Sequence, residues 1–138
     1  MKNISFKAVA IAVLATLGLD IISGIVLTMI LGGDTFASGL TEQQTQEAVA
    51  RLIASDAFLR SSLALGTLTT VIGGYIAARL ARTVPYFNAL AFGIVGILFG
   101  VAAAGDVPPW YQVIGFGLSL PAALLGGHIA KQQARRGA

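Results

Sequence analysis

The sequence predicts an all-α membrane protein: a single domain over residues 1–138, with four transmembrane helices and a short amphipathic helix. Hydrophobic residues make up 56% of the chain and charged residues only 11%, whereas a soluble domain carries about 25% charged residues. The mean hydropathy is +0.82, so the excess of apolar surface requires a lipid bilayer. The apolar residues also fall into four long stretches, each close to the roughly 20 residues that a helix needs to cross a bilayer.

The first span is predicted over about residues 8–31, and it contains one ionisable group, Asp20, near its midpoint. A secretory signal also begins with basic residues, but its apolar region covers only about 7–15 residues. We therefore expect a retained transmembrane helix. A carboxylate at the bilayer centre costs about 3 kcal/mol on insertion scales, so Asp20 is expected to face protein or water rather than lipid.

A short amphipathic helix is predicted over about residues 41–56. Thr41 and Gln44 have the spacing of a capping box, and Glu47 and Arg51 can pair at i,i+4 on the polar face. We interpret this segment as a helix at the membrane surface. The pattern leaves open whether it lies on the membrane or extends the second span.

The remaining spans are predicted over about residues 58–80, 87–104 and 110–130. Four spans bring most of the basic residues to one side, and the other side carries only Arg51 and Arg60 together with most of the acidic residues. By the positive-inside rule, both termini are then cytoplasmic. The basic residues on that side are Lys2, Lys7, Arg79, Arg82, Lys131, Arg135 and Arg136.

Small residues recur at every fourth position on all four spans. Such residues let helix backbones approach closely, which matters in lipid because no hydrophobic force drives helices together. We therefore predict a compact bundle whose helix contacts lie at Gly24, Gly66, Gly74, Gly93, Gly96, Gly100, Gly115, Ala123 and Gly127. The pattern does not distinguish contacts within one chain from contacts between chains.

A polar cluster is predicted in the middle of the membrane. Asp20 falls near the midpoint of the first span, Thr69 and Thr70 near that of the second, and Ser119 near that of the fourth. Pro121 has no N–H group, which frees the carbonyl of Gly117 to accept a hydrogen bond from elsewhere. No lysine or arginine reaches this level of the membrane.

Two main interpretations of this cluster remain open, beside a polar contact with another membrane protein. In the first, protonated Asp20 is structural and donates a hydrogen bond to Thr70, Ser119 or the Gly117 carbonyl. In the second, Asp20 binds and releases a proton or cation during transport, because intramembrane carboxylates commonly mark such pathways. A water-accessible cavity that reaches Asp20 would favour transport, whereas a fully packed Asp20 would favour the structural role.

Other classes of function have little support in the sequence. The chain has no cysteine, and its one histidine, His128, has no other ligand at coordination spacing, so we expect no metal site. The motifs of phosphate loops, dinucleotide sites and hydrolase nucleophiles are missing, and we expect neither enzymatic activity nor a cofactor. The pI of about 9.7 comes from basic residues at the span ends and does not indicate nucleic-acid binding.

The segment GGYIAAR, residues 73–79, ends the second span. It resembles a Gly-Gly-Tyr-x-Ala-x-Arg segment found in a group of small, uncharacterised bacterial inner-membrane proteins with four predicted spans. The resemblance implies a location in the bacterial cytoplasmic membrane and brings no known activity with it.

The preferred functional interpretation is an accessory or interaction protein, either self-associating or part of a larger membrane complex. Small-residue rows on every span and the lack of catalytic groups favour it. The alternative is a small oligomeric transporter or channel for protons or cations that uses Asp20. Four short helices enclose too little space for a substrate path, so this alternative requires at least a dimer.

Overall fold

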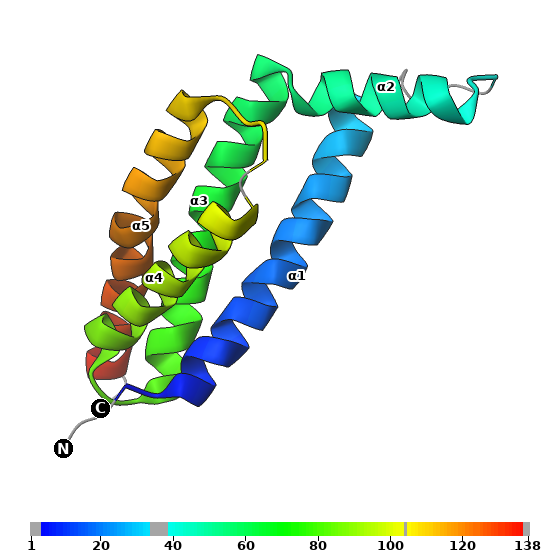
Figure 1. Ribbon diagram of the computed structural model, residues 1–138. Coiled ribbons are helices and arrows are strands. Elements are labelled where there is room, and N and C mark those ends of the chain that lie inside the picture. Colours follow the sequence, from blue (N-terminus) through cyan, green and yellow to red (C-terminus); the bar gives the residue numbers. More distant parts are fainter. Residues whose placement is uncertain (1–3, 34–38, 104, 137–138) are drawn as a thin grey trace.

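The structure is a computed structural model that describes residues 4–33, 39–103 and 105–136. Helices α1, α3, α4 and α5 form an elongated bundle, and α2 runs across one end of it (Figure 1). We call this the α2 end; α1 begins and α5 ends at the opposite end, which we call the terminal end. The bounds are α1 Phe6–Leu31, α2 Glu42–Ile53, α3 Asp56–Ala81, α4 Pro85–Ala103 and α5 Pro109–Arg136.

The predicted all-α architecture is confirmed. Four helices, α1, α3, α4 and α5, are long and apolar enough to cross a membrane. The largest difference from the predicted spans is at the end of α5, which continues past residue 130 to Arg136. Its last turns contain good helix formers and no breaking residue, so the helix extends beyond the apolar stretch. Ala104, the last residue of the predicted third span, lies outside the described residues.

The segment predicted as one helix over residues 41–56 contains a break. α2 ends at Ile53, and Ser55 is the N-cap of α3, where its hydroxyl accepts a hydrogen bond from the N–H of Phe58 (3.3 Å). An N-cap residue has non-helical backbone angles, so the chain changes direction at this point. As a result, α2 crosses the bundle end instead of extending α3 (Figure 1).

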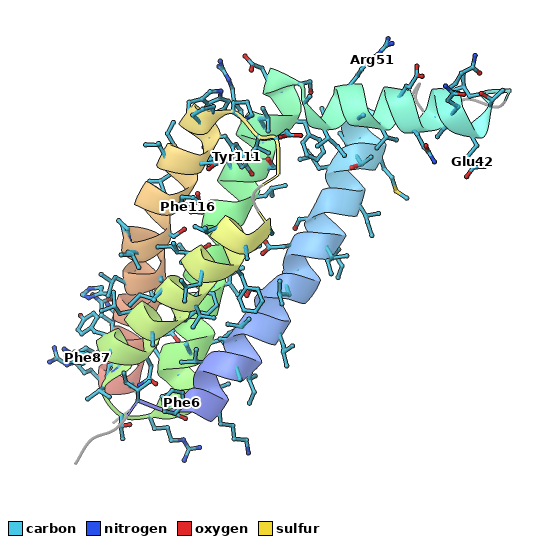
Figure 2. The ribbon with its side chains drawn as sticks, in the orientation of Figure 1. Phe6, Glu42, Arg51, Phe87, Tyr111 and Phe116 are labelled. Carbon is cyan, nitrogen blue, oxygen red and sulfur yellow. The ribbon has the colours of Figure 1, made fainter. Side chains whose placement is uncertain are left out.

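Local predictions for α2 are confirmed. The N–H of Gln44 bonds to the Thr41 hydroxyl, and the N–H of Thr41 bonds to the Gln44 side chain, which completes the capping box. Arg51 lies 4.0 Å from Glu47 and points away from the bundle (Figure 2). Because this ion pair is exposed, it contributes little to stability.

The closest backbone approach in the bundle is between α3 and α5, in the half toward the terminal end. A Cβ atom on Gly74 would lie 2.8 Å from the Cα of Ala123, and one on Gly126 would lie 2.5 Å from the backbone nitrogen of Tyr75. Both distances are too short for non-bonded heavy atoms. Neither glycine can therefore gain a side chain unless the two helices move apart.

Helices α1 and α4 pack around this contact. Phe92 of α4 and Thr16 of α1 are both buried and lie against Gly73 of α3, where a Cβ atom would overlap the Phe92 ring. On α5, Gly127 lies against Ala89 of α4, which is fully buried. The terminal half of the bundle is thus closed by glycines and alanines that leave little space between the helices.

A buried asparagine holds the turn between α3 and α4. Asn88 is fully buried; its Oδ1 accepts a hydrogen bond from the N–H of Ser5 (2.8 Å), and its Nδ2 donates to the carbonyls of Thr83 (2.9 Å) and Val84 (3.1 Å). Val84 has φ 39°, which is strained for a β-branched residue. Asn88 therefore stabilises a strained turn and fixes it to the N-cap of α1.

Toward the α2 end, α1 diverges from the other helices (Figure 1). Its first half buries Ala8, Val9, Ala12 and Thr16, whereas its second half buries only Leu27. In a bilayer, the exposed apolar side chains of this second half can contact lipid or another protein.

The predicted small-residue contacts divide between the two halves of the bundle. Gly74, Gly93, Ala123 and Gly127 lie at helix contacts in the terminal half, and Gly100 and Gly115 contact single side chains, Phe116 and Leu63. Three glycines that were predicted at helix contacts make no such contact, because the helices are separated at these positions. Open space surrounds Gly24, Gly66 and Gly96.

The first testable prediction compares two glycines of α5. Gly126→Ala should lower the free energy of unfolding by about 1–3 kcal/mol, as overpacking typically does, because the added methyl group would overlap the carbonyl of Val71. Gly117→Ala is the matched control, since nothing lies within 4 Å of its added atom. Thermal unfolding in detergent, followed by circular dichroism, measures both. Equal stability of the two variants would contradict the close α3–α5 contact.

Candidate functional site

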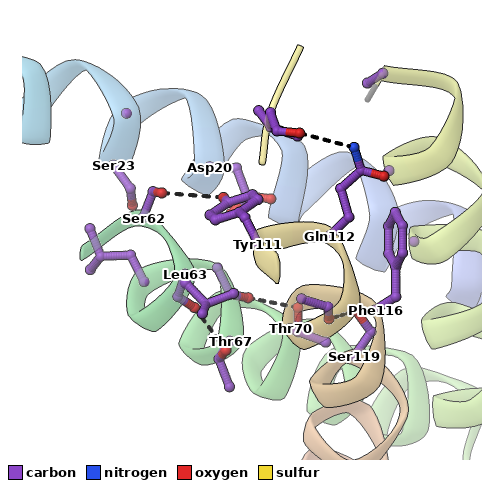
Figure 3. A pocket seen from close by; sticks show the side chains of 18 of the residues that line it. Asp20, Ser23, Ser62, Leu63, Thr67, Thr70, Tyr111, Gln112, Phe116 and Ser119 are labelled. Atoms are coloured by element: carbon purple, nitrogen blue, oxygen red, sulfur yellow. Dashed lines mark hydrogen bonds between the residues drawn. The ribbon is translucent and has the colours of Figure 1, made fainter. Parts of the chain in front are cut away.

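The half of the bundle toward the α2 end contains a cavity of about 450 Å³. Residues of α1, α3, α4 and α5 line it, from Phe58 and Tyr111 near the α2 end to Asp20 and Ser119 midway along the bundle (Figure 3). The three predicted contact glycines that meet no neighbour, at positions 24, 66 and 96, are among the lining residues. Their missing side chains help to keep this space open.

Asp20 of α1 is joined to α3 by one hydrogen bond. The Thr69 hydroxyl donates to Asp20 Oδ1 at 2.6 Å. The same hydroxyl lies 3.0 Å from the Gly66 carbonyl, but it has only one proton, and the shorter contact is with the carboxyl group. Among the described residues, Oδ2 of Asp20 has no hydrogen-bond donor, and the ion pairs lie elsewhere, at Glu47–Arg51 and Asp56–Arg60.

Thr70 and Ser119 line the same cavity as Asp20 but do not bond to it. The Thr70 hydroxyl donates to the Gly66 carbonyl (2.7 Å), and the Ser119 hydroxyl donates to the Gly115 carbonyl (2.8 Å). Both are bonds to the preceding turn of the same helix. The predicted bond from Asp20 to Thr70 or Ser119 is therefore replaced by the bond to Thr69.

The reason is the helix face on which α3 meets α1. Thr69 is 6% exposed and lies one turn before Gly73, which contacts Thr16 of α1. Thr70 lies about 100° further around the helix and faces the cavity. The signal was present in the sequence, because Thr69, Gly73 and Ala77 form a second row of small residues at i,i+4 spacing.

Gly117 does not join the predicted cluster. It is exposed and is not among the lining residues of the cavity. Two residues correspond to about 200° around a helix, so Gly117 and Ser119 lie on nearly opposite faces of α5. Within the described residues, no side chain donates a hydrogen bond to the Gly117 carbonyl, and α5 continues through Pro121.

Three hydroxyl groups present hydrogen-bond acceptors to the cavity, whereas the Ser23 hydroxyl and the Gln112 amide, which donates one hydrogen to the Val107 carbonyl, retain donor capacity. The hydroxyl protons of Thr67, Thr70 and Ser119 are used by carbonyls of their own helices, which leaves oxygen lone pairs as the free hydrogen-bonding capacity of these side chains. No lysine, arginine or histidine is found among the described residues that line the cavity. Together with Asp20, this lining favours a proton, a small cation or a protonated amine over an anion.

The single histidine belongs to a different group of side chains at the terminal end. The Tyr86 hydroxyl lies 2.7 Å from His128 Nδ1, and Gln132 Nε2 lies 2.7 Å from His128 Nε2. Both ring nitrogens thus have hydrogen-bond partners. Within the residues that the structure describes, no three His, Cys, Asp or Glu side chains are close enough to hold a metal ion.

Compared with protein-family models, curated proteins and solved structures, the chain has no significant match in any of the three. The resemblance of residues 73–79 to small bacterial inner-membrane proteins stays a prediction.

The second testable prediction concerns the bond between α1 and α3. Thr69→Val keeps the side-chain shape but removes the donor to Asp20, so it should lower the free energy of unfolding by about 0.6 kcal/mol and by no more than about 1.7 kcal/mol. Thr70→Val removes only a bond within α3 and should have a smaller effect. Thermal unfolding in detergent compares the variants.

A double-mutant cycle with Asp20→Ala separates this bond from other effects. We expect the Thr69→Val and Asp20→Ala changes to be coupled and the Thr70→Val and Asp20→Ala changes to be additive. Stronger coupling for Thr70 than for Thr69 would contradict the observed pairing.

Proposed function

We propose that the protein binds a proton or a small cation at Asp20 and moves it across the membrane, as a small oligomeric transporter or channel. The observation that carries this proposal is the cavity of about 450 Å³ that reaches Asp20. A purely structural carboxyl group would be expected in a packed site with its hydrogen-bonding capacity filled. Asp20 instead has one donor among the described residues and lies beside open space.

The lining supports a cationic ligand in particular. Asp20 is the only acidic side chain among the described lining residues, and hydroxyl oxygens of Thr70 and Ser119 lie on other walls of the same cavity. A cation that leaves water loses its hydration, and oxygen ligands on several sides can replace part of it. A carboxylate supplies the charge that makes this replacement favourable.

A single copy does not provide a continuous path. The cavity is bounded toward the terminal end by the close contacts of Gly73 with Phe92 and of Gly74 with Ala123. Transport therefore needs a rearrangement of this half or a contribution from a second copy. The second half of α1 buries only Leu27 and diverges from the other helices, so it is the natural place for either change.

The accessory or self-associating role is the second candidate, and the exposed face of α1 supports it. Ile21 and Ile25 are 63% and 52% exposed, and nothing lies within 4 Å of a Cβ atom built on Gly18. A helix from a partner could approach closely at this glycine. Site-specific crosslinking from Gly18 would recover a partner in this case.

The third testable prediction is the effect of Asp20 on flux. Purified protein in dye-loaded proteoliposomes should carry protons or a monovalent cation down an imposed gradient. Asp20→Asn keeps the size and hydrogen-bonding capacity of the side chain but cannot carry a negative charge, so it should reduce this flux by at least about tenfold, equivalent to about 1.4 kcal/mol.

The matched control is Asp56→Asn. It makes the same chemical change at an exposed ion pair at the start of α3, and it should leave the flux unchanged. Equal flux from the wild-type protein and a folded Asp20→Asn variant would exclude a role for Asp20. If wild-type protein carries neither protons nor cations, the transport proposal fails and the accessory role is favoured.

A further inference from the structure

A second hollow lies at the terminal end, between the C-terminal parts of α3 and α5. It is a groove of about 810 Å³, bordered by four basic side chains, Arg79, Arg82, Lys131 and Arg135. The remaining lining residues are apolar: Ala78, Leu80, Pro85, Ala130 and Ala134. The two halves of the lining therefore differ in chemistry, with positive charge beside a hydrocarbon surface.

The charge of this groove is not neutralised by acidic side chains of the described residues. Their carboxyl groups lie elsewhere: Asp20 lines the other cavity, and Glu42, Glu47, Asp56 and Asp106 lie on or beside helix ends at the α2 end. Both ion pairs among the described residues are also at the α2 end. No carboxyl group of the described residues therefore pairs with these four cations.

The ends of α3 and α5 offset only part of this charge. Each helix C-terminus carries about −0.5 of an elementary charge, so two ends contribute about −1 against the four positive side chains. Lysine and arginine at span ends would also satisfy the positive-inside rule without any ligand. That rule, however, does not require the basic residues to border one groove, and it does not require apolar side chains to line the same groove.

One of the cations is held in place. The Lys131 ammonium group lies 4.6 Å from the centre of the Tyr86 ring, a contact that limits the motion of its side chain. The guanidinium groups of Arg79, Arg82 and Arg135 are planar forks whose geometry matches the oxygens of a phosphate. The apolar side chains that the lining exposes are Leu80, which is 48% exposed, and Ala134, and a chain of methylene groups can lie against them.

We propose that this groove binds an anionic phospholipid, with the headgroup phosphate between the basic side chains of α3 and α5 and an acyl chain along Leu80 and Ala134. Basic pockets between transmembrane helices are suited to anionic headgroups. The apolar half of the lining favours a lipid over a soluble phosphate, because a soluble anion would leave that half uncovered. This site is separate from Asp20 and does not depend on the proposed transport.

The test uses the delipidated full-length protein in detergent and native mass spectrometry, which counts bound lipids. We expect one phosphatidylglycerol to bind at least about tenfold more tightly than phosphatidylcholine with the same acyl chains. Each lysine or arginine near the headgroup is expected to raise the affinity for an anionic lipid by up to about tenfold. The double variant Arg82→Gln/Arg135→Gln should weaken phosphatidylglycerol binding by about 30-fold. Inorganic phosphate at the lipid concentration should not displace the lipid.

The double variant Arg51→Gln/Arg60→Gln is the matched control. It removes two positive charges at the α2 end and should retain the preference for phosphatidylglycerol. If both double variants weaken binding equally, the attraction is only that of net charge and the proposal is overturned. Displacement by inorganic phosphate would instead indicate a site for a soluble anion and would also overturn it.

A further variant guards against a folding defect in the glutamine pair. Arg82→Lys/Arg135→Lys keeps both charges and loses only the planar forks, so it should show an affinity between those of the wild-type protein and the glutamine variant. Lipid binding is measured without flux, so this result stands apart from that of the Asp20 experiment. A lysine variant with no preference between the two lipids would contradict the proposed site.

Discussion

The structure depends on the close approach of α3 and α5 at Gly74, Ala123 and Gly126. In lipid, apolar side chains gain little by leaving the solvent, so helix association relies on contact between backbones and small side chains. The glycines at positions 74 and 126 permit a contact that no larger residue would allow. The α3–α5 pair forms the base on which α1 and α4 pack through Gly73, Ala89 and Phe92.

The same residue type has the opposite effect in the other half of the bundle. Where α1 diverges, the glycines at 24, 66 and 96 meet no neighbour and border a cavity. Asp20 lies at the boundary, bonded to Thr69 on the packed side and open to the cavity on the other. The close packing of the terminal half thus positions the carboxyl group of Asp20. If the other half were packed equally closely, this group would be completely buried.

Hydropathy and turn chemistry were sufficient to predict the four long helices, the capping box of α2 and the position of Asp20 midway along α1. Which small residues touch was harder to predict, because Gly73–Gly74 and Gly126–Gly127 each place glycines in two adjacent rows. The prediction used one row per helix, and it therefore missed Gly73, Gly126 and the pairing of Thr69 with Asp20. The divergence of α1 has no local signal, since its second half is as apolar as its first.

A cavity extends from the α2 end of the bundle to Asp20, whereas the terminal half is closely packed. The chain has no cysteine, so single cysteines can report this difference directly. In membrane vesicles, Thr70→Cys, which lines the cavity, should react with a charged, water-soluble thiol reagent at least about tenfold faster than Thr16→Cys, because a thiol buried among apolar groups is unreactive. Thr16 is 6% exposed and packs in the closed half. Equal rates at the two positions, or no reaction at Thr70→Cys, would contradict this arrangement.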